Sequence, residues 1–346
     1  MSIPSTFRLA VLTALLFCTM KFPAEIHASE LEGAWAFVLP DGNPAWLKLD
    51  KSDSQFVGSM LWSVGSAKPV NSLRVDSGTL TFERKVSWRP YGEGTVKNVV
   101  GPFRGVLKDG ELRLTFEQVT AQNDEARPEQ IVLNGKRIPP SPARPDLRFV
   151  VFGDAISLLN GKDLTGWKLS NPKKKNGWSV QDGILVNATP KQDFAAYGDF
   201  GNLITERSFT DFELTLDYNV SVNGNSGIYL RGMYEAQVVD RDSRMQGIHG
   251  PGAIFGRIKP SRNVANAGGE WNTYVLTLVD RHITAVLNGQ TVIDNQLLEG
   301  CTGGGIQAHD SLPGPIFLQG DHTAVKYRNI RLRPVVFKLS GRVRGQ

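Results

Sequence analysis

Cysteine is nearly absent from this chain of 346 residues, which contains two. Cys18 lies in an apolar segment near the N-terminus, and Cys301 lies in a glycine-rich stretch. If the N-terminal segment is removed, one cysteine remains, and no disulfide can then form within the chain. Cys301 is therefore predicted to be a small buried residue, and packing must hold the fold together.

Long hydrophobic runs are also scarce. The apolar stretch Leu9–Met20 is too short to span a membrane, and Lys21 and Pro23 end it. Arg8 precedes it, and the small residues Ala28 and Ser29 come after it. This pattern predicts a signal peptide over residues 1–29 rather than a membrane anchor. We therefore expect an exported protein, periplasmic or extracellular, with no stable membrane insertion.

Charge of one sign is not concentrated anywhere. The formal net charge is +5, but no long block of lysine or arginine occurs. The sequence also contains no recognisable nucleic-acid-binding module. Nucleic acid is therefore not an expected partner.

A sustained helical period of 3.6 residues is missing as well. Instead, apolar and polar residues alternate over Phe212–Val220, the pattern of a half-buried strand. Turn pairs such as Asp109-Gly110 and Asn288-Gly289 separate short strand-like runs, and the chain holds 36 glycines. Many short strands with regular turns predict an all-β protein that contains a sandwich or jelly roll.

The chain divides at a proline-rich stretch. Residues 136–149 contain four prolines, which neither a helix nor a sheet interior tolerates, so they are predicted to form a stiff linker. Residues 30–135 before it are predicted to form a small β domain of unknown role. Residues 150–336 after it form the larger β domain, followed by a tail over 337–346.

Arg231, Glu235 and Gln237 form the most informative group of polar residues. They lie in an expected hairpin, and the arginine follows an apolar run. A planar cation beside a carboxylate and an amide suits a polyhydroxylated ligand. The alternative is a structural ion pair. A three-residue turn, Gly232–Tyr234, would pair Arg231 with Glu235 and place the group in one cleft, whereas a two-residue turn would send Glu235 to the opposite face.

Eight short motifs follow one another in a fixed order between Phe152 and Arg333. Together they resemble the 3-keto-disaccharide hydrolase family, also described as 3-keto-glucoside 1,2-lyase and 3-keto-2-hydroxy-glucal hydratase. The resemblance implies a concanavalin-like jelly-roll β-sandwich and a carbohydrate substrate. The smaller β domain predicted before it lies outside the resemblance. The motifs are Ser157–Trp167, Trp178–Leu185, Phe209–Leu214, Asn225–Gln237, Gly252–Gly256, Gly269–Tyr274, Leu287–Gly289 and Val325–Ile330.

The resemblance implies cleavage of a 3-keto-glucoside or 3-keto-disaccharide by elimination at carbon 2, followed by hydration. We expect Glu235 to serve as base or acid with His322 as its partner, and Arg231 or a bound cation to hold the oxyanion. In this family the histidine usually follows the glutamine by two positions, whereas His322 follows Gln319 by three. Further substrate contacts are expected from Tyr229, Gln237, Asp240, His249 and Gln319.

Several alternatives remain open from the sequence. Asp240 could instead cap a strand, and His249 could be a spacer in a loop. The spacing does not indicate zinc, but calcium or magnesium could bind oxygen atoms of Glu235, Asp240 or Asp321. The protein could also be a non-catalytic carbohydrate-binding protein. An ordinary glycoside hydrolase on the same fold is a third possibility, although its Glu-x-Asp-x-x-Glu strand motif is absent.

Overall fold

The computed structural model describes residues 28–52, 55–88, 96–122, 125–191 and 199–339. Most of the predicted signal peptide and most of the tail fall outside these ranges. The described helices are all short 3-10 turns, and none of them is long and apolar enough to cross a membrane. They are η1 (Ala28–Glu30), η2 (Leu147–Phe149) and η4 (Gly247–His249).

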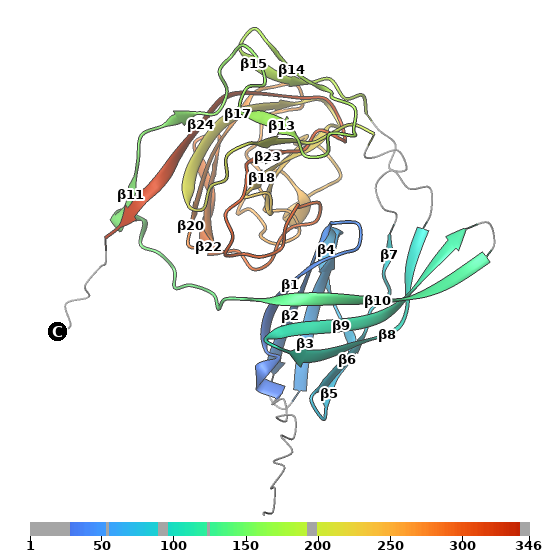
Figure 1. Ribbon diagram of the computed structural model, residues 1–346. Helices are drawn as coiled ribbons and strands as arrows, with labels where there is room; N and C mark the ends of the chain where they lie inside the picture. The colour runs from blue at the N-terminus through green and yellow to red at the C-terminus, as the bar shows by residue number, and fades with distance from the viewer. Residues whose placement is uncertain (1–27, 53–54, 89–95, 123–124, 192–198, 340–346) are drawn as a thin grey trace, which may run out of the picture.

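The N-terminal domain is one antiparallel sheet of ten strands. Its strands are β1 (Gly33–Val38), β2 (Pro44–Ser52), β3 (Gln55–Trp62), β4 (Val64–Pro69), β5 (Asn71–Asp76), β6 (Thr79–Glu83), β7 (Ser87–Trp88), β8 (Val96–Lys108), β9 (Glu111–Gln122) and β10 (Glu125–Ile138). The strand order is β4-β3-β2-β1-β10-β9-β8-β6-β5, and β7 pairs with β8 (Figure 1). The predicted hairpin at Asp109-Gly110 joins β8 to β9, and both of its turn residues have positive φ.

The C-terminal domain contains two antiparallel sheets, as expected for a jelly-roll β-sandwich. The nine-stranded sheet has the order β14-β15-β24-β17-β20-β21-β22, with β11 and β12 also paired to β24. The five-stranded sheet has the order β13-β16-β23-β18-β19. The bounds are β11 (Val150–Phe152), β12 (Ile156–Ser157), β13 (Trp167–Leu169), β14 (Trp178–Gln181), β15 (Ile184–Asn187), β16 (Leu203–Thr205), β17 (Phe212–Val220), β18 (Asn225–Leu230), β19 (Tyr234–Val239), β20 (Asn272–Val279), β21 (His282–Leu287), β22 (Gln290–Leu297), β23 (Phe317–Leu318) and β24 (Val325–Lys338).

Strand β17 shows why the sequence forms this sandwich. Its alternation of apolar and polar residues becomes an alternation of buried and half-buried side chains along the whole strand, as predicted. Phe212, Leu214 and Leu216 have no exposed surface and belong to the core between the two sheets. The all-β fold class is therefore confirmed.

The domain boundary lies slightly later than the sequence indicated. Strand β10 continues to Ile138, so the regular sheet includes the first residues of the predicted linker. Strand β24 likewise continues to Lys338. The chain then crosses from the end of β10 to β11 along the side of the molecule (Figure 1).

The two domains share apolar packing. On β2, the side chains of Leu47 and Leu49 belong to the N-terminal core, whereas the intervening Trp46 packs into the C-terminal core. Strand β3 repeats this alternation, with Met60 in the N-terminal core and Leu61 in the C-terminal core. Because successive residues of a strand face opposite sides, this part of the sheet is buried on both faces.

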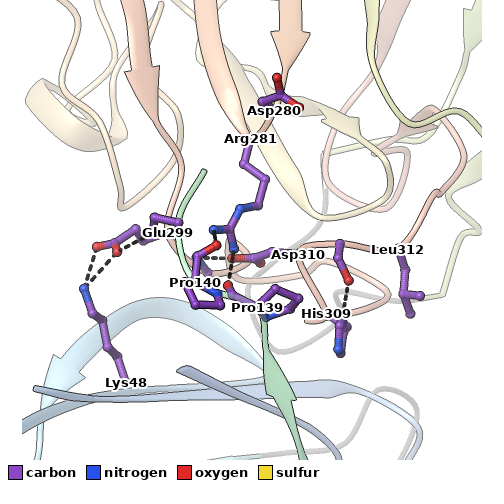
Figure 2. Close-up of polar contacts among 12 residues, drawn as sticks. Lys48, Pro139, Pro140, Asp280, Arg281, Glu299, His309, Asp310 and Leu312 are labelled. Atoms are coloured by element: carbon purple, nitrogen blue, oxygen red, sulfur yellow. Dashed lines mark hydrogen bonds and ion pairs between the residues drawn. The ribbon is translucent and has the colours of Figure 1, made fainter. Parts of the chain in front are cut away.

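Polar contacts reinforce the junction (Figure 2). The ammonium of Lys48 on β2 lies 2.8 Å from a carboxylate oxygen of Glu299 in the C-terminal domain. The guanidinium of Arg281, from the β20–β21 turn, donates to the carbonyls of Pro139 at 3.3 Å and Pro140 at 2.8 Å. The linker is therefore held to the larger domain by its backbone.

Arg281 also neutralises a buried carboxylate. Its Nη1 lies 3.4 Å from Oδ2 of Asp310, which is 1% exposed. Burial raises the pKa of Asp310, while the Gly300 N–H and the Arg281 charge oppose that rise. The carboxylate would lose its main ion-pair partner without Arg281.

We predict that Arg281→Ala lowers the free energy of unfolding by about 3 kcal/mol, because it leaves Asp310 buried and unpaired. Urea unfolding at pH 7 measures the change. Arg144→Ala is the matched control, since Arg144 lies in the same junction but its ion pair with Asp294 is exposed. The control should change stability by less than about 1 kcal/mol. Equal effects of the two substitutions would contradict the prediction.

Candidate functional site

The outer face of the five-stranded sheet, turned away from the sandwich core, carries the polar residues of the β18–β19 hairpin. Tyr229 pairs with Glu235, and Gly227 pairs with Gln237. The alternate residues, such as Ile228, belong to the core. One face of this hairpin is therefore apolar and structural, and the other presents a tyrosine, a carboxyl group and an amide.

The turn of this hairpin differs from the prediction. It begins at Arg231, which has a φ of 54°, and it closes where Leu230 pairs with Tyr234. The expected turn over Gly232–Tyr234, which would have paired Arg231 with Glu235, is wrong. The observed turn is also three residues long, so the glutamate still lies on the outer face.

Contacts from a distant loop explain the observed turn. The N–H of Ile306 donates to the carbonyl of Gly232 at 2.8 Å, and the N–H of Thr302 donates to the carbonyl of Met233 at 2.9 Å. The side-chain amide of Gln307 donates to the turn as well. These bonds satisfy buried carbonyls of the turn, so tertiary structure rather than local propensity selects the register.

Arg231 does not join Glu235. Its guanidinium lies 5.4 Å from the ring of Tyr234 and 3.4 Å from the carbonyl oxygen of Leu312. Tyr234 precedes Glu235 on β19 and therefore points to the opposite face of the sheet. The structure thus separates the arginine from the glutamate, and we assign Arg231 no role at the oxyanion.

Glu235 is buried on the outer face, with 4% of its surface exposed. Burial raises the pKa of its carboxyl group to about 8, against a smaller lowering by its hydrogen bond with Tyr229, and the negative charge of Asp321 adds to the rise. Gly227 makes room for the group, because a Cβ there would lie 2.3 Å from Oε1 of Glu235. At pH 7 the carboxyl group is therefore mainly neutral.

Tyr229 is held in place next to Glu235. The phenol hydroxyl donates to the carbonyl of Gly303 at 3.0 Å, and its ring stacks on Phe317 with centroids 4.4 Å apart. These contacts fix the hydroxyl that bonds to the carboxyl group of Glu235.

Asp321, whose negative charge acts on Glu235, forms a pair with His322. Nδ1 of His322 lies 2.6 Å from Oδ1 of Asp321, and both side chains are largely buried. The N–H of Gln319 bonds to the carbonyl of Gly227 at 2.9 Å, which attaches the loop to β18. A histidine oriented by a carboxylate is a common arrangement for a general base.

Gln237, Gln319 and His249 complete the group on this face. Nε2 of Gln237 donates to the backbone carbonyl of His249 at 3.2 Å. Nε2 of Gln319 lies 3.4 Å from the hydroxyl of Tyr229, while its buried Oε1 has no hydrogen-bond partner among the described residues. An unpaired buried carbonyl oxygen can accept a hydrogen bond from a ligand hydroxyl or from water.

Asp240 lies at the end of β19 with a capping geometry. Its carboxylate accepts hydrogen bonds from the backbone N–H groups of Asn223 at 2.7 Å and Gly268 at 3.1 Å. These bonds join two loops to the strand end. A role of Asp240 as a strand cap, the structural alternative, accounts for these hydrogen bonds without any contact to a substrate.

Among the residues that the structure describes, no three or more histidine, cysteine, aspartate or glutamate side chains gather as metal ligands would. A calcium or magnesium ion at Glu235, Asp240 or Asp321 stays a prediction. Cys301 is fully buried, and burial raises the pKa of its thiol to about 12. It is a packing residue, in agreement with the sequence-based expectation.

Comparison with known proteins places this chain in a family. Residues 154–333, more than half of the chain, match the 3-keto-alpha-glucoside-1,2-lyase-like domain. The chain belongs to this family. The match contains Glu235, Asp321 and His322 and leaves out the N-terminal domain.

Individual relatives are more distant. A 3-keto-disaccharide hydrolase of Bacteroides thetaiotaomicron is 25% identical over 169 residues, which cover 41% of this chain and 58% of the relative. A candidate glycosyl hydrolase of Parabacteroides distasonis, known from a crystal structure, is 21% identical with a TM-score of 0.43 and covers 52% of this chain and 94% of that one. A carbohydrate-binding module of Bacillus subtilis is 13% identical with a TM-score of 0.33. The match covers 50% of this chain and 97% of that module.

Sequence reasoning missed two contributors to the candidate site. Asp321 had been considered only as a metal ligand, although its position directly before His322 was a usable signal. Thr302 accepts a hydrogen bond from the N–H of Glu235 at 3.0 Å. It lies 67 residues away in the sequence, and no local pattern marks it.

We predict that Glu235→Gln removes a pH dependence of stability. Between about pH 5 and 8 the unfolded chain ionises Glu235 while the folded protein keeps it protonated, so wild-type stability falls as pH rises. The glutamine amide of the variant does not titrate, so it adds no such pH dependence to the stability. The free energy of unfolding of the variant relative to wild type should therefore increase between pH 5 and 9 by on the order of 4 kcal/mol.

Urea unfolding at pH 5, 7 and 9 measures this difference. The exposed Glu206 supplies the control, and Glu206→Gln should shift stability by the same small amount at each pH. A difference between Glu235→Gln and wild type that stays constant from pH 5 to 9 would show that the carboxyl group is ionised in the folded protein.

Proposed function

We propose that the protein cleaves 3-keto-glucosides or 3-keto-disaccharides by elimination and subsequent hydration. The observation that carries the proposal is a buried carboxyl group with a raised pKa that feels the charge of Asp321, the partner of His322, in a chain of the 3-keto-α-glucoside-1,2-lyase-like family. Elimination needs one group that accepts a proton and one that donates a proton. Glu235 is the candidate proton donor, and His322 is the candidate proton acceptor.

His322 is the proposed base. The 3-keto group makes the carbon-2 proton acidic, and the imidazole removes it while Asp321 stabilises the resulting imidazolium. The electron pair of the carbon–hydrogen bond forms an enolate. Its collapse breaks the bond between carbon 1 and the aglycone oxygen and leaves a 3-keto-2-hydroxy-glucal.

Glu235 is the proposed acid. With a pKa near 8 it carries the proton that the departing aglycone oxygen requires. In the second half of the reaction, water adds to carbon 1 with the help of the resulting carboxylate, and carbon 2 regains a proton. Gln237 and Gln319 are proposed to bind sugar hydroxyls, for which the unpaired Oε1 of Gln319 is suited.

Direct displacement at carbon 1 is the second candidate reaction. The nearby Asp321 favours it, since a retaining glycoside hydrolase uses two carboxyl groups. However, Asp321 is bonded to His322 at 2.6 Å, which suits an orienting role better than a nucleophilic one.

An exported location is part of the proposal. It rests on the apolar segment Leu9–Met20 and the small residues after it. N-terminal sequencing of the mature protein tests it, with a new terminus expected close to residue 30. A mature chain that retains Leu9–Met20 would argue against export by this route.

We predict that a reaction in deuterated water introduces deuterium at carbon 2 of the 3-keto-glucose product, above the level of the enzyme-free control. Elimination must break the carbon–hydrogen bond at carbon 2, whereas displacement leaves it intact. Mass spectrometry and proton NMR of the product detect the label. Product without the label, or equal turnover of the unoxidised disaccharide, would contradict the proposed reaction.

We further predict that Glu235→Gln reduces cleavage by about 10²- to 10⁴-fold while exchange at carbon 2 continues. The amide cannot protonate the leaving oxygen, but His322 can still remove the carbon-2 proton. His322→Gln should lose both cleavage and exchange, and the surface control Glu206→Gln should retain both. If Glu235→Gln loses exchange and His322→Gln keeps it, the two roles are reversed.

A further inference from the structure

The N-terminal domain reaches the candidate site through Ser63, which joins β3 to β4, and through the first three residues of β4. We call Ser63–Ser66 the β3–β4 hairpin tip. The carbonyl of Ser63 accepts a hydrogen bond from the N–H of Gly304 at 2.9 Å. The hydroxyl of Ser66 lies 2.8 Å from Nε2 of His249. Both contacts are made to segments that border the outer face.

The segment at Gly303-Gly304 is a single layer of backbone between the hairpin tip and Tyr229. A Cβ at Gly303 would lie 2.3 Å from the carbonyl oxygen of Gly65, on the side of the N-terminal domain. A Cβ at Gly304 would lie 2.7 Å from the hydroxyl of Tyr229, on the side of the site. Only glycine, which has no Cβ, fits at each of these two positions.

This layer links the hairpin tip to Glu235 through hydrogen bonds. The N–H of Gly304 bonds to the tip, and the carbonyl of Gly303 accepts the proton of Tyr229. Tyr229 in turn contacts the carboxyl group of Glu235. Hydrogen bonds therefore connect the N-terminal domain to Glu235, the group proposed as the acid.

His249 is held from two sides. Gln237, on the outer face, donates to its backbone carbonyl, and Ser66 bonds to its ring. The ring also packs on Phe255 with centroids 4.9 Å apart. A Cβ at Gly256 would lie 2.6 Å from the hydroxyl of Ser66, so the serine fits closely against this loop.

Packing between the two domains holds the β3–β4 hairpin tip in a fixed position. Trp46 and Leu61, from β2 and β3, pack into the core of the larger domain. The guanidinium of Arg257 stacks over the indole of Trp46 at 4.5 Å and donates to the carbonyl of Cys301, next to the glycine layer. Apolar packing of this kind keeps the two domains in one arrangement.

We propose that the two domains build one sugar site, with the β3–β4 hairpin tip as a wall and Ser66 as a positioning residue for His249. The hydrogen bond between Ser66 and His249 orients the imidazole toward a hydroxyl of the bound 3-keto-sugar. This gives residues 30–135 a part in substrate recognition. The identity of the sugar rests on the proposed function. The contact between Ser66 and His249 is independent of it.

Two readouts on the full-length protein test the proposal with Ser66→Ala. The ¹⁵N resonances of the His249 ring, assigned by their loss in His249→Gln, should shift because Nε2 loses its partner. The KM for a 3-keto-glucoside should rise by about tenfold, the effect of one lost hydrogen bond, and by more than kcat falls. The melting temperature should stay near that of wild type.

Two further variants separate positioning from general damage. Ser66→Thr keeps the hydroxyl group and should restore the resonances and most of the KM. Ser52→Ala changes an exposed serine at the far end of β2 and should leave both readouts unchanged. A wild-type KM in Ser66→Ala, or no shift of the His249 resonances, would overturn the proposal.

Failure of the proposed function gives a different result. If wild type turns over no 3-keto-glucoside, the KM readout is replaced by titration with 3-keto-glucose, followed at the His249 ring. A saturable shift that weakens in Ser66→Ala would support the shared sugar site without the reaction. The absence of any sugar-dependent shift in wild type would overturn the shared site as well.

Discussion

Burial of the Glu235 carboxyl group is the constraint on which the site depends. The sheet holds the group on its outer face, under loops that exclude water, and there the neutral acid is favoured over the carboxylate. The charge of Asp321 acts in the same direction. The same Asp321 forms a hydrogen-bonded pair with the imidazole of His322. The division into acid and base follows from the environments of the groups rather than from their residue types.

Glycine makes the close approach of these segments possible. Gly227 leaves space for the glutamate, and the Gly303-Gly304 layer leaves space for Tyr229 on one side and the hairpin tip on the other. The family domain and the N-terminal domain therefore meet at the site itself as well as at the apolar interface around Trp46. A domain outside the family match thus lies within two hydrogen bonds of the tyrosine that contacts Glu235.

Local patterns predicted much of the fold but not the contacts between distant segments. The alternation over Phe212–Val220 and the hairpin at Asp109-Gly110 were correct because period and turn chemistry are local properties. The β18–β19 register was wrong because carbonyls of its turn are bonded to residues some 70 positions away, such as Ile306. The packing of Trp46 into the other domain could not be predicted, since alternation does not say what covers the second face of a strand.

The protonation state of Glu235 at neutral pH tests the central claim most directly. Infrared difference spectra between wild type and Glu235→Gln, recorded from pH 6 to 10, isolate the carbonyl band of this one carboxylic acid. The account predicts a protonated carboxyl band at pH 7 that is lost with a midpoint near pH 8. A carboxylate band already present at pH 6, with no protonated band to lose, would contradict it and would leave the site without its acid.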